Sequence, residues 1–239
     1  MLTKALKKLL PYRLRRHAEV FLVDHGFPVR KKLGTRGIDQ LGYRGYVGRP
    51  EAFEAAGRLQ YRFLLDRGLA PFHVLCDIGC GSLRGGRYFV EYLNPGNYLG
   101  LEAEKELVEL GLAHAMSQGI LKAKTPEFAF SSGFEFDRFS KSPDFALAVS
   151  VFSHLTEHDI RLCLANLARR VTDTCQFFAS FFEVPEPYPN FKQSHAHLGF
   201  YYTVDQMKGF GLQTGWAPTF VGEWGSLSGQ QMMAFAIRK

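Results

Sequence analysis

The stretch Val74-Leu-Cys-Asp-Ile-Gly-Cys-Gly-Ser-Leu-Arg-Gly-Gly86 decides the fold, because an apolar run in it ends at a turn rich in glycine. The apolar residues predict a buried strand that ends at Ile78, and Gly79 and Gly81 allow the backbone to turn tightly before a helix begins. Asp77 adds a carboxylate at the end of this strand. A helix that starts directly after a strand presents backbone N–H groups, so the turn is predicted to approach a ligand.

A dinucleotide does not suit this turn. The dinucleotide fingerprint G-x-G-x-x-G requires a third glycine where this chain has Arg84. In addition, the carboxylate of Asp77 would meet the negative charge of a pyrophosphate in a desolvated cleft. A ligand that carries an ammonium and a sulfonium group fits an acid at this place better.

Short apolar strands alternate with helical segments along most of the chain. The strands are expected at about residues 72–78, 97–101, 128–130, 144–150, 175–182, 212–221 and 231–237. This alternation predicts an α/β fold with a doubly wound, mainly parallel, seven-stranded sheet that helices cover on both faces. Because no helix separates the last two strands, they are predicted to form an antiparallel hairpin that contains the one reversed strand.

The chain before residue 51 differs from the rest in charge and in pattern. Residues 1–32 carry nine basic and two acidic residues, whereas the other 207 residues have a net charge of −1. Two short helices are expected on either side of Pro11, and the glycine-rich residues 35–50 are expected to form a loop. We therefore divide the chain into a basic helical N-terminal extension and cap, residues 1–50, and one domain, residues 51–239.

Composition excludes several classes of protein. The longest apolar run, residues 232–237, is far shorter than the roughly 18 residues that a membrane span needs, and the N-terminal stretch lacks the features of a secretory signal. Four cysteines without a C-x-x-C pair argue against a disulfide framework and against structural zinc. The neutral body argues against a nucleic-acid partner. The expected location is the cytoplasm.

The motif Asp77-Ile-Gly79-Cys-Gly81 resembles the first motif of class I S-adenosylmethionine-dependent methyltransferases. The resemblance extends over about residues 55–238, because a second strand ends in an acid, Glu102, and the chain closes in a predicted hairpin. The runs GCGSLRGGRYFVEYL and GQQMMAF are also similar to those of bacterial methyltransferases that modify sugars or other small molecules. The resemblance implies a Rossmann-like sheet that binds S-adenosylmethionine.

The same resemblance implies roles for the residues of the turn. Gly79 and Gly81 are expected to line the amino-acid part of the cofactor, Asp77 to contact its ammonium, and Glu102 to accept hydrogen bonds from its ribose hydroxyls. A carboxylate at the carboxyl end of a strand is also a natural acceptor for a vicinal diol on physical grounds alone.

Three further residues are predicted to lie at the cofactor, namely Cys80, Arg84 and Ser150. Cys80 is interpreted as a small filler rather than a nucleophile. Arg84 either faces the carboxylate of the cofactor or is a solvated residue of the first helical turn.

The chain departs from the family pattern at two places. Leu83 stands where the family motif has its third glycine. No acid stands clearly after the third strand, so adenine recognition is assigned either to the backbone around Gly133 and Phe134 or to Glu135.

The acceptor of the methyl group is predicted to be a hydroxyl. Enzymes that methylate base amines carry a [DNS]PP[YF] motif after the fourth strand, whereas this chain has Ser150-Val-Phe-Ser153. A hydroxyl acceptor needs a base, and histidine is the usual one at neutral pH. His154 follows the fourth strand, and His195 and His197 lie in a long aromatic insertion after the fifth.

Each of these histidines also has an alternative interpretation. A histidine at the place of His154 more often hydrogen-bonds the turn that contains it than acts as a base, and an H-x-H pair such as His195 and His197 can bind a metal. Because no third ligand stands at a suggestive spacing, no metal is predicted. Tyr43, Tyr46 and Trp224 are candidates for contacts with cofactor or acceptor, with ordinary packing as the alternative.

The sequence thus predicts an O-methyltransferase for a small molecule or glycan intermediate, such as a polysaccharide precursor or secondary metabolite. Carboxylate, amine and carbon acceptors remain alternatives, and no oligomeric state is predicted.

The alternative from another class is a non-catalytic, membrane-surface-associated binding module that retains the fold. It rests on residues 1–32, which would contact an anionic membrane at the inner face, because three leucines and three lysines there divide between two helix faces. They are Leu2, Leu6 and Leu9, and Lys4, Lys7 and Lys8. Packing of the leucines on the domain is the competing interpretation.

Overall fold

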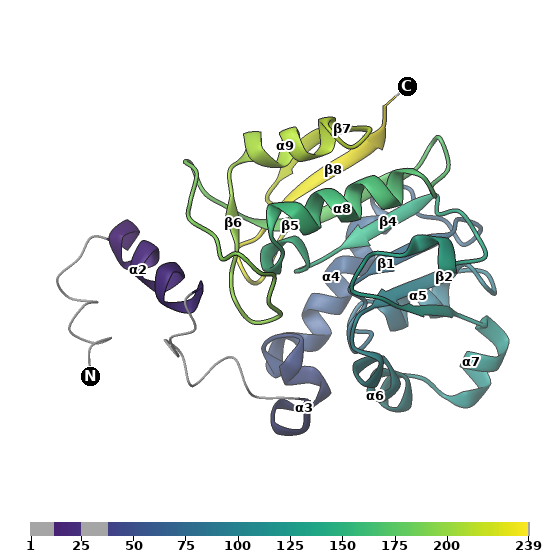
Figure 1. Cartoon of the computed structure of the whole chain (residues 1–239). Coiled ribbons are helices and arrows are strands. Elements are labelled where there is room, and N and C mark those ends of the chain that lie inside the picture. Colours follow the sequence, from purple (N-terminus) through teal and green to yellow (C-terminus); the bar gives the residue numbers. More distant parts are fainter. Residues whose placement is uncertain (1–11, 25–37, 239) are drawn as a thin grey trace.

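The computed structural model of the protein describes residues 12–24 and 38–238, and its centre is one mixed sheet (Figure 1). The strand order is β3-β2-β1-β4-β5-β8-β7, and the short β6 pairs with β5 beside this path. The strands are β1 (Leu75–Ile78), β2 (Tyr98–Glu102), β3 (Glu127–Phe130), β4 (Phe145–Ala148), β5 (Gln176–Glu183), β6 (Tyr201–Tyr202), β7 (Trp216–Gly222) and β8 (Gln231–Ile237). The α-helices are α2 (Tyr12–Asp24), α3 (Ile38–Tyr46), α4 (Phe53–Leu65), α5 (Gly86–Tyr92), α6 (Lys105–Ala115), α7 (Gln118–Lys124), α8 (Glu157–Ala168) and α9 (Val204–Leu212).

Parallel pairing brings the carboxyl ends of the central strands to one edge of the sheet. β1 pairs in parallel with β2 and β4, and Asp77 lies opposite Gly100 on one side and Leu147 on the other. β8 runs antiparallel to both of its neighbours, β5 and β7. The predicted mainly parallel α/β sheet with a reversed strand in a C-terminal hairpin is therefore confirmed. The additional strand β6 was not predicted, because a two-residue strand carries no periodic signal.

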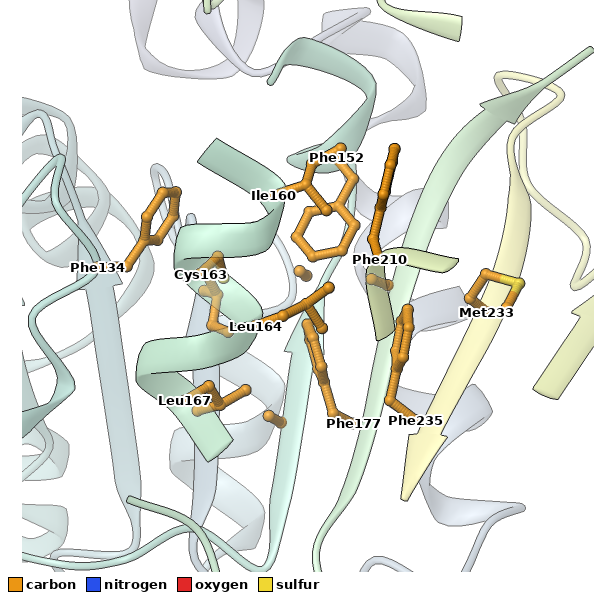
Figure 2. Close-up of a cluster of buried hydrophobic side chains, with 14 of the residues drawn as sticks. Phe134, Phe152, Ile160, Cys163, Leu164, Leu167, Phe177, Phe210, Met233 and Phe235 are labelled. Carbon is orange, nitrogen blue, oxygen red and sulfur yellow. The ribbon is translucent and has the colours of Figure 1, made fainter. Parts of the chain in front are cut away.

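The sheet separates two apolar clusters. α8 and α9 pack on one face, where Leu164, Phe177 and Phe235 lie in one continuous cluster (Figure 2). α4 to α7 pack on the other face, where Leu75 and Phe89 belong to a second cluster. Every residue of β1 is buried, which explains why its sequence is a continuous apolar run rather than an alternating one.

The prediction of a loop over residues 35–50 was wrong, because this stretch contains helix α3. Gly42 has a positive φ of 66° and kinks the helix. Tertiary contacts overcome the low helix propensity of glycine here. The ring of Tyr43 stacks on His114 of α6 with a centroid distance of 4.4 Å, and its carbonyl accepts a hydrogen bond from the hydroxyl of Ser82.

Helix α6 ends at Ala115, and a separate helix, α7, begins at Gln118. Met116 is extended, with a φ of −137°, and the side chain of Ser117 caps the N-terminus of α7. Serine at an N-cap favours a new helix start over continuation of the old one.

Part of the N-terminal extension lies outside the described residues, including Leu2, Leu6 and Leu9 and the lysines between them. Helix α2 begins directly after Pro11 and is described to Asp24. In the part of the chain that the structure describes, no helix has the length and apolar character needed to cross a membrane.

Helices α4 and α6 pack closely against the glycine-rich turn, and each has a glycine at the point of contact. A Cβ atom at Gly57 of α4 would overlap the carbonyl oxygen of Arg84, and one at Gly111 of α6 would lie 2.6 Å from the carbonyl oxygen of Ser82. Both obstacles are backbone atoms, which cannot rotate away. The close approach of α4 and α6 therefore fixes the position of the turn between them.

We expect the substitution Gly57→Ala to lower the free energy of unfolding by about 1–3 kcal/mol, because the new methyl group must push the turn away. Gly209→Ala in α9 is the matched control, since a Cβ there meets nothing within 4 Å. It should raise stability by about 0.4–1 kcal/mol, because alanine restricts the unfolded chain. Urea unfolding of both variants measures this difference, and equal effects would contradict it.

Candidate functional site

A cavity of about 950 Å³ opens at the carboxyl edge of β1, β2 and β4. The ends of these strands form its floor. Three segments from elsewhere in the chain complete its walls, namely residues 45–49, 194–197 and 226–228. The guanidinium of Arg49 donates a hydrogen bond of 3.3 Å to the carbonyl of Leu227, which joins the first and the last of these segments.

The glycine-rich turn forms one wall of the cavity. Gly79 and Gly81 have φ values of 65° and 56°, and the amide of Gly79 donates to the carbonyl of Leu101 at 2.7 Å. Leu83, at the position of the family's third glycine, also has a positive φ of 61° although it carries a side chain. The side chain of Leu83 is fully buried, and this burial offsets the backbone strain.

Asp77 lies on the cavity wall and is 5% exposed. The hydroxyl of Tyr98 donates a hydrogen bond of 2.8 Å to its carboxylate. The pKa of Asp77 is raised to about 7, mainly by burial and also by the charge of Glu102, while the Tyr98 hydrogen bond and the charge of Arg84 act in the opposite direction. Because the charged form of this buried carboxyl group is disfavoured, a cation placed against it stabilises the carboxylate strongly.

Glu102 ends β2 on the same wall, and the backbone fixes its carboxylate. One oxygen accepts a hydrogen bond of 2.9 Å from the amide of Gly81, and the other accepts from the amides of Ala103 and Glu104. The oxygen that accepts from Gly81 has capacity for a further hydrogen bond, whereas the other oxygen already accepts two. The side chain is thus already oriented for hydroxyl groups in the cavity.

Arg84 is not a solvated residue of the first helical turn. It lines the cavity, and its guanidinium donates a hydrogen bond of 2.9 Å to the carbonyl of Val47. Burial lowers the pKa of Arg84, and the charge of Asp77 acts in the opposite direction. Arg84 therefore attaches the segment after α3 to the turn.

Ser150 has a φ of 60°, which non-glycine residues rarely adopt, and a closed set of hydrogen bonds holds it there. The amide of Ser150 donates to the hydroxyl of Ser180 at 2.8 Å, and this hydroxyl donates to the side-chain oxygen of Gln230 at 2.6 Å. The side-chain nitrogen of Gln230 donates back to the hydroxyl of Ser150 at 3.0 Å. The ends of β4, β5 and β8 are thereby connected beneath the cavity.

Sequence reasoning missed Ser180 and Gln230. Gln230 stands in the closing run GQQMMAF, which carried part of the family resemblance, and that run was the one available signal. Ser180 had none, because it is a lone serine inside an apolar strand.

All three predicted histidines line the cavity, although they come from two distant segments. The amide of His195 donates to the carbonyl of His154 at 3.0 Å, which attaches the insertion after β5 to the turn after β4. The ring of His197 meets Tyr46 edge to face, with a centroid distance of 4.9 Å. The sequence grouped these residues correctly in space.

For two of the three histidines, hydrogen bonds indicate which ring nitrogen carries the proton. Nδ1 of His154 lies 2.9 Å from the carbonyl oxygen of Leu198, so this nitrogen carries the proton and Nε2 is an acceptor. Nδ1 of His195 accepts a hydrogen bond from the amide of His197, so its neutral ring carries the proton on Nε2. Burial lowers the pKa of His154, and the charges of His197 and His195 lower it further, against the Leu198 hydrogen bond. His154 is therefore neutral near pH 7.

The remaining candidates differ in their positions. Cys80 lines the cavity, and burial raises the pKa of its thiol well above the usual value, so it is not a nucleophile at neutral pH. Tyr43 packs on α6, whereas Tyr46 and Trp224 line the cavity. After β3, Ser131, Ser132 and Phe134 line the cavity, and Glu135 pairs with Arg138. Among residues 12–24 and 38–238, no group of three or more potential ligands could hold a metal ion.

Comparison with known proteins finds similarity to methyltransferases over the central part of the chain. Residues 76–177, from β1 to the start of β5, match a family model described as a methyltransferase domain. The search of curated proteins finds no match.

Solved structures of methyltransferases have the same fold. The magnesium protoporphyrin IX methyltransferase of Synechocystis PCC 6803, with bound S-adenosylmethionine, is 13% identical with a TM-score of 0.59, over 94% of this chain and 97% of that one. Human N-acetylserotonin methyltransferase, also in complex with S-adenosylmethionine, is 13% identical with a TM-score of 0.62, over 92% of this chain and 62% of that one. A putative O-methyltransferase of Nostoc punctiforme PCC 73102 is 13% identical with a TM-score of 0.62, over 95% of this chain and 69% of that one.

At these identities the solved structures show the fold alone, and the family model adds the sequence relationship over the strands that form the floor of the cavity. We conclude that residues 76–177 are similar to a methyltransferase domain, and that the chain has the fold of solved methyltransferases, two of which hold bound S-adenosylmethionine.

Proposed function

We propose that the protein transfers the methyl group of S-adenosylmethionine to a hydroxyl of a small molecule or glycan intermediate, with His154 as the general base. The observation that carries this proposal is the state of the His154 ring. Its Nδ1 is engaged by the Leu198 carbonyl, and its neutral Nε2 is an acceptor in a residue that lines the cavity. The putative O-methyltransferase with the same fold is consistent with it.

The cofactor side of the cavity fits S-adenosylmethionine. Asp77 supplies a buried carboxylate for an ammonium group, and Glu102 supplies fixed oxygens for ribose hydroxyls. Gly79 and Gly81 keep the wall free of side chains, and Ser150 contributes a hydroxyl beside them. When bound, S-adenosylmethionine supplies an electrophilic methyl group on a sulfonium.

We expect Glu102→Gln to weaken the binding of S-adenosylmethionine by about 1–2 kcal/mol, or roughly five- to thirtyfold, because hydrogen bonds to a charged acceptor are lost. Isothermal titration calorimetry measures this change. Glu91→Gln on the outer side of α5 is the control, since Glu91 is exposed and does not line the cavity. Unchanged affinity in Glu102→Gln would contradict the assignment of the ribose site.

The work of the chain in the reaction is orientation and proton transfer. The floor and walls hold the acceptor oxygen against the methyl group, and orientation of this kind contributes several kcal/mol in enzymes. The acceptor proton moves to Nε2 of His154, because burial favours the neutral ring and the Leu198 hydrogen bond places the ring proton on Nδ1 and orients the ring.

The walls on the acceptor side combine aromatic and hydroxyl-bearing side chains. Tyr46, Phe182 and Trp224 provide flat apolar surfaces, and Ser194 and Ser226 provide hydroxyls. This combination supports a polyhydroxylated or aromatic acceptor over a purely apolar one. Residues 45–49 belong to the wall, which supports the proposal that residues 1–50 include a cap of the domain at residues 51–239.

Incubation of the protein with S-adenosylmethionine that carries a labelled methyl group, and with acceptor pools, tests the proposal. Nucleotide-sugar, glycan and phenolic pools should yield labelled, base-stable ethers, whereas carboxylic acids should give base-labile esters. Binding of the cofactor without transfer to any pool would favour the non-catalytic binding module instead. That alternative draws on N-terminal residues outside the described part, and the cytoplasmic location with peripheral membrane contact stays a proposal with it.

A further inference from the structure

The connection between β5 and β6, residues 184–200, carries His195 and His197 to the cavity and is called the acceptor loop below. Its outgoing and returning limbs lie side by side at their base. The side chain of Asn190 donates to the carbonyl of Tyr201 at 2.8 Å and accepts from the amide of Tyr201 at 2.9 Å. The limbs are therefore joined on the side away from the cavity.

Arg16 of α2 joins the same two limbs from outside. Its Nε donates to the carbonyl of Pro189 at 3.3 Å on the outgoing limb, and its Nη2 donates to the carbonyl of Gly199 at 2.7 Å on the returning limb. The side chain is buried although it comes from a helix more than 170 residues earlier in the chain. A buried arginine that reaches so far must be held by specific contacts.

Three aromatic rings surround the guanidinium. Its central carbon lies 4.2 Å from the ring centroid of Phe191, 5.5 Å from that of Tyr201 and 5.7 Å from that of Tyr188. Glu19, one turn further along α2, balances its charge at 3.4 Å. A planar guanidinium stacks flat on rings while its N–H groups donate within its own plane, and a compact ammonium lacks this planar geometry.

A second contact of α2 supports this attachment. The carboxylate of Asp24 accepts a hydrogen bond of 3.1 Å from the amide of Lys192 in the acceptor loop. Figure 1 shows α2 on the side of the molecule where β6 and the acceptor loop lie. The helix thus contacts the loop through Arg16 and through its last residue, Asp24.

The part of the acceptor loop that lines the cavity is attached to the segment after β4, residues 153–156. The amide of His195 donates to the carbonyl of His154, and the amide of Phe200 donates to the carbonyl of Ser153 at 2.8 Å. The hydroxyl of Ser194 accepts from the amide of Thr156. A shift of the limbs would therefore move the loop histidines and the carbonyl of Leu198 that orients His154.

We propose that Arg16 is a positioning residue for the acceptor site, which fixes both limbs of the acceptor loop so that His195, His197 and the Leu198 carbonyl stay in place. Helix α2 is then part of the catalytic unit rather than an appendage of it. The proposal rests on the proposed methyl transfer for its catalytic consequence, but the attachment of the loop can be tested without any acceptor.

The test uses the full chain with Arg16→Ala and Arg16→Lys, and with Arg138→Ala as the control, because Arg138 forms an exposed ion pair with Glu135 and lies outside the acceptor loop. Hydrogen–deuterium exchange should show at least tenfold faster exchange in peptides from residues 189–201 of both Arg16 variants, with β1 unchanged. Affinity for S-adenosylmethionine should stay within twofold of the wild type, while kcat/KM for an acceptor found in the pools falls at least tenfold. Ethylguanidinium, but not ethylammonium, should restore part of the protection in Arg16→Ala.

The outcomes separate the two proposals. Unchanged exchange in the acceptor loop, or faster exchange with unchanged kcat/KM, would overturn the positioning role. Equal restoration of protection by ethylguanidinium and ethylammonium would also overturn it, because a positive charge without the guanidinium geometry would then be enough to hold the loop. If the wild type methylates no acceptor, the proposed function fails, whereas the exchange and rescue measurements still decide whether Arg16 holds the loop. Arg16→Lys carries the same test if Arg16→Ala does not fold.

Discussion

Replacing His154 with alanine should lower the turnover number by a factor of about 10²–10⁴ and leave the affinity for S-adenosylmethionine unchanged. The loss is expected because the acceptor hydroxyl would have to give its proton to water instead of to a fixed imidazole nitrogen. The neutral ring and its free Nε2 follow from burial and from the hydrogen bond to Leu198, so both are properties of the folded chain. Single-turnover kinetics with labelled cofactor measure the chemical step directly.

His158→Ala is the matched control, because His158 is exposed on the first turn of α8 and does not line the cavity. It should turn over like the wild type. His195→Ala should have a smaller effect than His154→Ala, since Nδ1 of His195 already accepts the amide of His197. A full loss in His197→Ala with normal turnover in His154→Ala would move the base to the acceptor loop. Normal turnover in all three would indicate an acceptor that needs no histidine base, such as a carboxylate.

The fold and the position of Asp77 and Glu102 beside one cavity were predictable because their signals are local. The apolar run before Gly79 marks a buried strand, and an acid at the end of each of two adjacent strands marks the edge where a ligand binds. Asp77 and Glu102 needed only the rule that parallel strands end at a common edge. His195 and His197 were selected on another ground, because they lie in a long aromatic insertion of the kind that covers a substrate.

What the sequence could not supply depends on contacts between distant residues. The hydrogen bond from Ser180 to Gln230 spans 50 positions, and that from Arg16 to Gly199 spans 183. No periodicity encodes either contact, because each side chain stands alone in its segment. The choice among the histidines likewise depends on which carbonyl lies beside which ring nitrogen. Helix α3 was missed for a related reason, since its stability comes from packing on α6 rather than from its glycine-rich sequence.

The second large effect is expected in the pH dependence of cofactor binding. The pKa of Asp77 is raised from 3.8 to about 7, first by burial, so the carboxyl group is increasingly protonated as the pH falls below 7. The ammonium of S-adenosylmethionine favours the ionised form, and binding must therefore release a proton at lower pH. Affinity should be nearly constant above pH 8 and fall by up to about tenfold per pH unit below 7, which is roughly a hundredfold by pH 5.

Asp77→Asn isolates this effect, because the amide is similar in shape, can still accept the hydrogen bond from Tyr98 and does not titrate. The variant should bind weakly at pH 8 and lose most of the pH dependence, as measured by calorimetry at several pH values in two buffers of different ionisation enthalpy. Tyr92→Phe, outside the cavity, should keep the wild-type slope. An undiminished slope in Asp77→Asn would assign the titration to another group.

The titration of Asp77 should affect the stability of the unliganded protein in the opposite direction from its effect on cofactor affinity. A carboxyl group whose pKa is higher in the folded than in the unfolded state stabilises the fold relatively more at low pH, and this contribution is lost as the pH rises from about 4 through 7. Asp77→Asn removes the buried charge, so its melting temperature without cofactor should exceed that of the wild type at pH 8, with the difference shrinking towards pH 5. A variant with a higher melting temperature but weaker cofactor binding would show that Asp77 serves the ligand, because its charge lowers the stability of the unliganded fold.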